Sequence, residues 1–148
     1  MKKIVLISCV SKKLPTRARA QDIYVSALFR LNLQYAKKLN PEAIYILSAM
    51  HGLLGLDDEI EPYDLTLNTM SSRQIKAWAG KVMDQINACS DLTHDHFVFL
   101  AGEKYRKFLL PHLASYEVPM QGLTIGRQLQ FLNGQIHEGY MRSIAPSA

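Results

Sequence analysis

The feature that most constrains the fold is a series of four short apolar runs separated by segments with helical periodicity. The runs are rich in Ile, Val and Leu and lack the polar alternation of a strand with one face in water. They lie at residues 3–9, 44–47, 96–101 and 116–118. Strands that alternate with helices predict an α/β fold. We expect a three-layer α/β/α domain over residues 1–148 with a short, mostly parallel four-stranded sheet.

The segments between these runs predict the helices. Asp22 is the expected cap of a first helix that ends near Leu39. Ser71 or Ser72 caps a second helix that ends near residues 87–90, and Trp78 belongs to its core face. A short helix follows Gly102, and a last helix covers residues 127–137.

Composition excludes several classes of protein. The net charge of +4 is compatible with an anionic partner. The two cysteines, Cys9 and Cys89, form no C-x-x-C pair, so we expect reduced thiols in a cytoplasmic protein. No apolar stretch is long enough to span a membrane, so no membrane partner is expected.

Motifs for metals and cofactors are weak. His94-Asp95-His96 resembles a ligand pair, but the two histidines fall on opposite faces of a strand and no third ligand lies nearby. A polar loop is the preferred interpretation. No G-x-G-x-x-G follows the first strand and no Walker loop is present, so a dinucleotide is not expected. We expect neither a metal nor a cofactor.

Polar and small residues follow each predicted strand. In a parallel sheet, ligands bind where the strands end in their carboxyl direction. Four loops therefore predict a pocket at that edge, and they carry Ser8 and Lys12, Ser48 and His51, Gly102 and Glu103, and Gly122 and Gly126. Gly102 would let a ligand approach the start of the following helix.

The loop after the second strand contains five carboxylates in the eight residues 57–64. Asp57 and Asp58 are expected to be solvated. His51 and Asp64 are candidate site residues, because titratable groups beside a strand end often belong to a site.

A second charged loop carries Lys12, Lys13, Arg17 and Arg19. These cations form either a solvated surface or a phosphate clamp, and the sequence leaves both open.

Several of these residues form a pattern that resembles an uncharacterised domain family of bacteria and phages. The pattern comprises Ser8-Cys9 with Lys12, residues 24–29, Leu47-Ser48-Ala49-x-His51-Gly52-Leu53, Glu61-Pro62-Tyr63-Asp64, and a late glycine pair with Leu129. The resemblance implies nucleic-acid modification and a sheet like that of the uracil-DNA glycosylase class. The glycosylase motifs Gly-Gln-Asp-Pro-Tyr and His-Pro-Ser-Pro do not occur.

We therefore expect an enzyme that acts on a nucleotide or nucleic-acid base by cleaving or exchanging an N-glycosidic bond. Asp64 or Glu61 would orient water or stabilise an oxocarbenium-like centre, and His51 would stabilise the departing base. Tyr63 would stack on a flipped base. The remaining substrate-binding candidates comprise phosphate ligands and pocket residues, namely Lys12, Lys13, Ser8, Ser48, Gly102 and Glu103.

Two alternatives remain open. The first is a non-catalytic module that binds a nucleotide or nucleic acid, associated with a modification or defence system, in which His51 and Asp64 are structural. The second is a hydrolase or transferase with Cys9 as nucleophile, although a cysteine inside a strand is usually inert.

Overall fold

The structure is a computed structural model that describes residues 1–8 and 12–144, with side chains up to residue 137. Its centre is a five-stranded sheet in the order β4-β3-β1-β6-β7. Four strands are parallel, and β4 is antiparallel at one edge. Their bounds are β1 (Lys3–Ser8), β3 (Ala43–Ser48), β4 (Gly52–Gly55), β6 (His96–Leu100) and β7 (Ser115–Glu117). The predicted α/β class is confirmed.

The predicted sheet lacked β4, whose residues we assigned to a loop. Gly52 allows the chain to turn back beside β3, because its φ of +75° is a conformation that favours glycine. A Cβ at Gly52 would also collide with the side-chain oxygen of Gln85. That oxygen accepts a hydrogen bond from Leu53 N at 2.9 Å, which ties β4 to the helix behind it.

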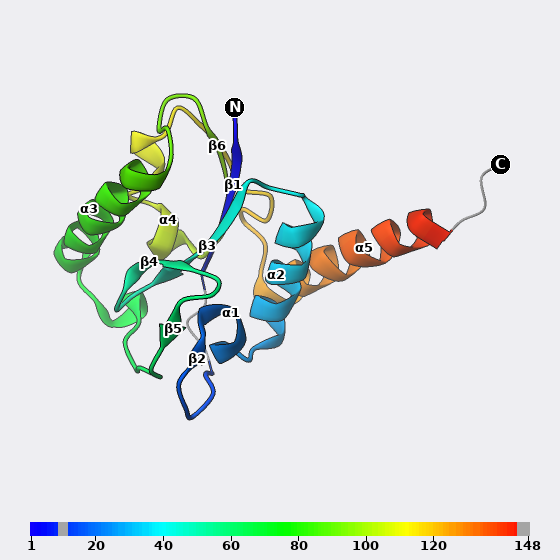
Figure 1. Cartoon of the computed structure of the whole chain (residues 1–148), viewed down its shortest axis with the longest axis horizontal. Coiled ribbons are helices and arrows are strands. Elements are labelled where there is room, and N and C mark those ends of the chain that lie inside the picture. Colours follow the sequence, from blue (N-terminus) through cyan, green and yellow to red (C-terminus); the bar gives the residue numbers. More distant parts are fainter. Residues whose placement is uncertain (9–11, 145–148) are drawn as a thin grey trace.

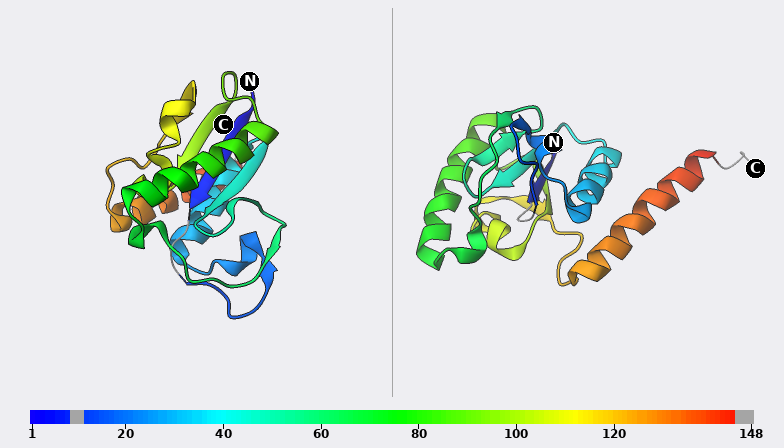
Figure 2. Two further views of the ribbon diagram at one scale, coloured as in Figure 1. Left: turned by 90° about the vertical axis from the view of Figure 1, so that its left-hand side faces the viewer. Right: turned by 90° about the horizontal axis from the view of Figure 1, so that it is seen from below.

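Helices cover both faces of the sheet (Figure 1, Figure 2). Alternate residues of β1 face opposite sides: Ile4 and Leu6 belong to one core, and Val5 and Ile7 to the other. The first core packs under α3 (Ser72–Cys89) and α4 (Glu103–Arg106). The second packs under α1 (Ala20–Ile23), α2 (Ala27–Lys38) and α5 (Ile125–Ile144). Short 3₁₀ turns, η1 (Leu67–Thr69) and η2 (Leu110–His112), complete the chain. The three-layer arrangement is therefore confirmed.

The first predicted helix is interrupted, and Asp22 is not its cap. Residues Tyr24 and Ser26 lie in extended backbone between α1 and α2. Ser26 caps α2 by accepting a hydrogen bond from Phe29 N at 3.2 Å. Lys13 pairs with Tyr24 in an isolated bridge, and Val25 N donates to Lys12 O at 3.0 Å. These long-range bonds replace helical ones. The last helix also differs from the prediction, since α5 runs from Ile125 to Ile144.

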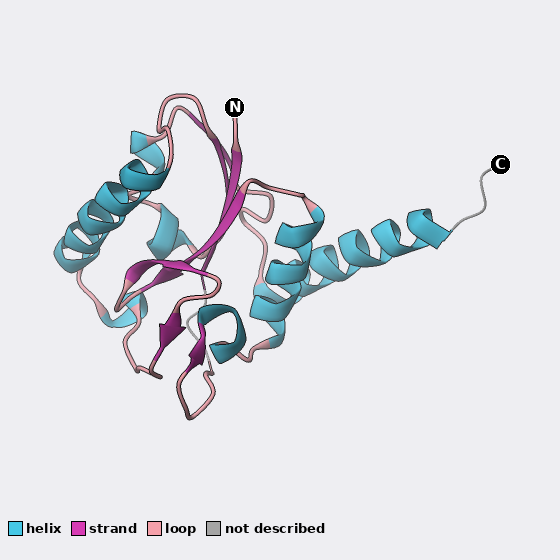
Figure 3. Ribbon diagram, viewed as in Figure 1, coloured by secondary structure: helices cyan, strands magenta, loops and turns pink. Residues whose placement is uncertain are grey.

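A second, two-stranded sheet lies beside the carboxyl ends of the main strands (Figure 3). It joins β2 (Ala18–Arg19) to β5 (Glu59–Ile60). Ion pairs reinforce this link: Arg17 pairs with Glu59 at 3.7 Å and Glu61 at 3.4 Å, and Arg19 pairs with Asp22 and Asp57. Arg17 and Arg19 therefore meet carboxylates of the acidic loop.

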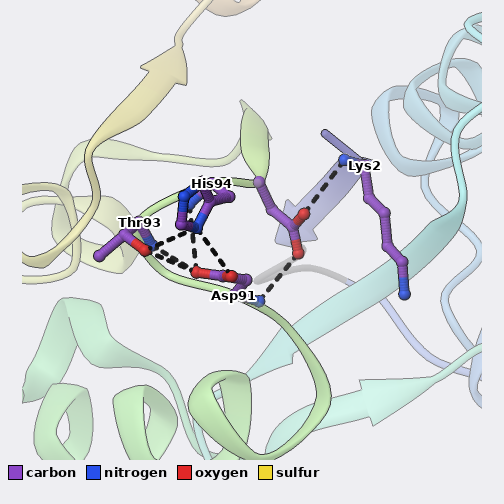
Figure 4. Close-up of polar contacts among 5 residues, drawn as sticks. Lys2, Asp91, Thr93 and His94 are labelled. Carbon is purple, nitrogen blue, oxygen red and sulfur yellow. Dashed lines mark hydrogen bonds and ion pairs between the residues drawn. The ribbon is translucent and has the colours of Figure 1, made fainter.

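The polar turn between α3 and β6 lies at the opposite end of the main sheet, where β6 begins (Figure 4). Asp91 accepts hydrogen bonds from Thr93 and contacts His94 Nδ1 at 2.9 Å. These contacts, chiefly those from Thr93, lower the pKa of Asp91 to about 2. The buried Asp95 accepts from Asp91 N at 2.8 Å and Lys2 N at 3.1 Å. This turn thus fastens the amino terminus to the sheet.

The two histidines of the His94-Asp95-His96 sequence have different partners. His94 contacts Asp91, whereas His96 contacts Ser115 Oγ at 2.6 Å and Glu117 at 3.3 Å. Within residues 1–8 and 12–144, no group of three or more His, Cys, Asp and Glu is arranged to hold a metal ion. In the same part of the chain, we find no helix whose length and apolar character suffice for a membrane crossing.

Candidate functional site

The order of the parallel strands reverses between β1 and β6. From β1 the chain passes to β3 on one side, and it then crosses to β6 on the other side. The helices that follow these strands leave on opposite faces of the sheet, which opens a crevice at the carboxyl ends of the two strands. This position is the natural ligand site of such a sheet.

A cleft of about 590 Å³ lies at this position. We call it the β1–β6 cleft. Its lining includes three predicted substrate-binding residues, Ser8, Gly102 and Glu103. Gly102 N donates a hydrogen bond to Ser8 Oγ at 3.1 Å, which joins the ends of the two strands. The volume is in the range of sites for small molecules.

The wall of the β1–β6 cleft formed by α2 contains Asn32. Its side chain is only 2% exposed, and its Oδ1 has no hydrogen-bond partner among the described residues. Ser26 and Phe29 line the same wall, so the first turns of α2 face the cleft. A buried carbonyl without a partner costs about 1–3 kcal/mol, and a ligand with a suitable donor would remove that cost.

Two further lining residues of the cleft carry polar side chains. Gln128, in the first turns of α5, and Lys104, in α4, both line it. Lys104 Nζ donates to Asn68 O at 3.3 Å, and Asn68 is itself a lining residue. The cleft therefore combines apolar walls with a few polar groups, as binding sites for small organic ligands do.

A second cleft, of about 600 Å³, lies beside the β2–β5 sheet. We call it the acidic cleft. Its lining includes the predicted residues His51, Glu61, Tyr63 and Asp64, together with Arg17. Glu61 and Asp64 are exposed, and Glu61 pairs with Arg17 at 3.4 Å. From the sequence we expected these residues and those of the β1–β6 cleft to share one pocket, whereas they line two clefts.

Tyr63 is the centre of a hydrogen-bonded cluster beside the acidic cleft. Its hydroxyl accepts from Ser48 Oγ at 2.9 Å and lies 2.7 Å from the hydroxyl of the buried Tyr24. Lys13 Nζ lies 4.3 Å from the centroid of the Tyr63 ring and 5.6 Å from that of Tyr24. The predicted residues Lys13, Ser48 and Tyr63 are thus together. Tyr24 joins them, and its ring also packs on Phe29 of the β1–β6 cleft at 5.1 Å.

His51 packs edge-to-face against Tyr63, with ring centroids 5.6 Å apart. Its backbone N donates to Ser48 Oγ at 3.1 Å, while its Nε2 is buried without a hydrogen-bond partner in the described part of the chain. Burial lowers the pKa of the imidazole, and the positive charge of Lys81 lowers it further. Both effects favour the uncharged form of the imidazole.

Three further residues singled out in the sequence lie at the surface, outside the described residues and in the core, respectively. Lys12 is exposed, and its carbonyl oxygen accepts from Val25 N. Cys9 lies outside the described residues. Trp78 belongs to the core as predicted, and its Nε1 donates to Ser48 O at 2.9 Å.

Asn32 is the functional candidate that sequence reasoning missed. The helical spacing of Phe29, Asn32 and Tyr35 gave a signal, because it places a polar amide between two buried aromatic residues. A polar residue at a core position needs a partner or a role.

Comparisons with known proteins identify a family. Searches of curated proteins and of solved structures find no match to the chain. The model of a family of unknown function, DUF6884, matches residues 4–134. That span contains both clefts and the Tyr63 cluster. The chain is a member of DUF6884.

Proposed function

We propose that the chain binds a nucleobase or nucleotide in the β1–β6 cleft and cleaves or exchanges its N-glycosidic bond. The observation that carries the proposal is the buried Asn32 oxygen without a partner, in a cleft at the strand-order reversal. Ring N–H and amino groups of bases are donors that would pair with it. The apolar part of the wall, with Phe29 and Leu100, suits a flat heterocycle.

Glu103 is the carboxylate of the β1–β6 cleft on which the chemistry depends. It would orient water and stabilise positive charge on the sugar as the bond to the base breaks. Water then gives its hydroxyl to the anomeric carbon, and its remaining proton leaves with the base. In an exchange reaction, a second base takes the place of water. Asp64 and Glu61 stay candidates only if the substrate also extends into the acidic cleft.

A non-catalytic nucleotide-binding module is the second candidate. It is favoured by the placement of His51, Glu61 and Asp64, which line the acidic cleft rather than the β1–β6 cleft. Both candidates imply a cytoplasmic protein, because nucleotides are found there. Both also require the β1–β6 cleft to bind a base.

A base-release experiment distinguishes the two. The protein is incubated with nucleosides and with single- and double-stranded DNA and RNA that carry normal or modified bases, and free base is measured by mass spectrometry. Release by the wild type that is lost in Glu103→Gln, and retained in the matched surface variant Glu42→Gln, supports the enzyme. Binding without release from any substrate supports the module. Neither binding nor release would refute both.

A further inference from the structure

A group of lysines beside the β1–β6 cleft has no acidic partner. Among the described residues, ion pairs of Lys and Arg within 4.0 Å involve only Arg17 and Arg19, which meet Asp22 and the acidic loop. The exposed Lys76, Lys104 and Lys107 have none. α3 and α4 carry the carboxylates Asp84 and Glu103, and neither forms an ion pair with Lys or Arg within 4.0 Å among the described residues.

Two of these lysines lie beside one aromatic ring. Lys76 Nζ lies 5.4 Å and Lys107 Nζ 5.5 Å from the centroid of the Phe108 ring. Lys104 precedes Lys107 by one helical turn and lines the β1–β6 cleft. We call Lys76, Lys104, Lys107 and Phe108 the α3–α4 basic surface. Its residues belong to α3, to α4 and to the turn after α4, and these two helices lie on the same face of the sheet (Figure 1).

We propose that the α3–α4 basic surface binds the phosphate backbone of a single-stranded polynucleotide whose base enters the β1–β6 cleft. The inference rests on the proposed function, and it makes the substrate a base within a strand rather than a free nucleoside. Gathered lysines repel one another, and a polyanion relieves that repulsion. Basic grooves with aromatic side chains are the usual surface for single strands.

A single strand suits this surface better than a duplex. A base in a duplex must first be unpaired and unstacked at a cost of a few kcal/mol, whereas a single strand presents it directly. The two arginines of the predicted phosphate clamp, Arg17 and Arg19, are already paired with carboxylates, whereas the lysines of this surface are not.

The test measures the salt dependence of oligonucleotide binding. Fluorescein-labelled oligo-dT and oligo-rU are titrated with the full chain by anisotropy over a series of salt concentrations. The variant Lys76→Gln/Lys107→Gln changes the surface and leaves the lining of the cleft intact. Each lost phosphate contact lowers the slope of log K against log salt by about 0.7, so we expect the double variant to lose about 1.4.

The charge-matched variant Arg17→Gln/Arg19→Gln is expected to keep the slope of the wild type. A double lysine variant that binds like the wild type would overturn the inference, and so would a loss of slope confined to the arginine variant. Polyglutamate that competes as well as oligo-dT would overturn the polynucleotide assignment.

Titration with the common nucleosides separates this inference from the proposed function. We expect the wild type and the double lysine variant to bind a nucleoside equally well. Absence of nucleoside binding by the wild type would contradict the proposed function. Nucleoside binding together with an unchanged oligonucleotide slope in the lysine variant would contradict the basic surface alone.

Discussion

Replacement of Asn32 by leucine should make the protein more stable and remove its ligand. The Asn32 oxygen is buried and has no hydrogen-bond partner among the described residues. Leucine has no polar group to leave unpaired, and the adjoining cleft has room for its larger side chain. Stability and binding are therefore expected to change in opposite directions.

The magnitude follows from the cost of an unpaired polar group. That cost is about 1–3 kcal/mol, so Asn32→Leu should raise the free energy of unfolding by about that amount. For a chain of this size, each kcal/mol raises Tm by about 2–4 °C. Leucine also has a higher helix propensity than asparagine, by a few tenths of a kcal/mol. This contribution must be subtracted from the measured change in the free energy of unfolding.

Urea unfolding followed by circular dichroism measures the change. The control is Asn87→Leu, an exposed position in α3 that carries a similar change in propensity without the burial. We expect this control to change the free energy of unfolding by less than about 0.5 kcal/mol. An Asn32→Leu protein that is less stable than the wild type, or no more stable than Asn87→Leu, would refute the reasoning. So would nucleoside binding that survives the substitution.

Three further predictions concern the hydrogen bonds and pKa values. Tyr63→Phe should lower the free energy of unfolding by about 1–3 kcal/mol, because it removes the phenol oxygen that accepts from the buried Ser48 hydroxyl; an unchanged urea midpoint would contradict this. NMR titration should give His51 a pKa below 6.5, because burial disfavours the charged imidazole; a pKa above 6.5 would show that burial does not dominate. The free energy of unfolding should then decrease as the pH falls below 6.5, and His51→Gln should remove this decrease. Asp91 and Asp95 have lowered pKa values, so they stabilise the fold above pH 3.8, and this contribution is lost as the pH falls through their folded-state pKa values, which for Asp91 is about 2. The free energy of unfolding, measured from pH 2 to 5, should therefore depend less on pH in Asp91→Asn than in the wild type. An identical pH dependence in the two proteins would contradict the stabilising role of Asp91 in this turn.

The sequence was sufficient for the fold class because the strands carry their signal locally. Val5 and Ile7 on one side and Ile4 and Leu6 on the other are all at most 3% exposed, so an uninterrupted apolar run was needed. The prediction of the first helix failed because tertiary contacts decide where that helix begins. The capping of α2 by Ser26 and the pairing of Lys13 with Tyr24 divide a segment that local periodicity treats as one helix.

The candidate site was predicted in part for a similar reason. The predicted strand ends place Ser8 near Gly102, and the structure joins these two residues by a hydrogen bond; it also joins Ser48 to Tyr63. The sequence did not show that the first pair lines the β1–β6 cleft while Tyr63 lines the acidic cleft. The division into two clefts depends on how the β2–β5 sheet packs beside the strand ends, which is a tertiary contact. Asn32 was missed because a helix stripe was examined for apolar residues only.

Mapping of nucleoside binding by NMR tests the location of the site. A series of ¹⁵N-labelled samples is titrated with each common nucleoside, and the shifted backbone amides are assigned. We predict that the shifts concentrate at Phe29, Asn32, Gly102 and Gln128, which line the β1–β6 cleft. Shifts confined to His51, Glu61, Tyr63 and Asp64 would instead place the ligand in the acidic cleft and contradict the proposed site.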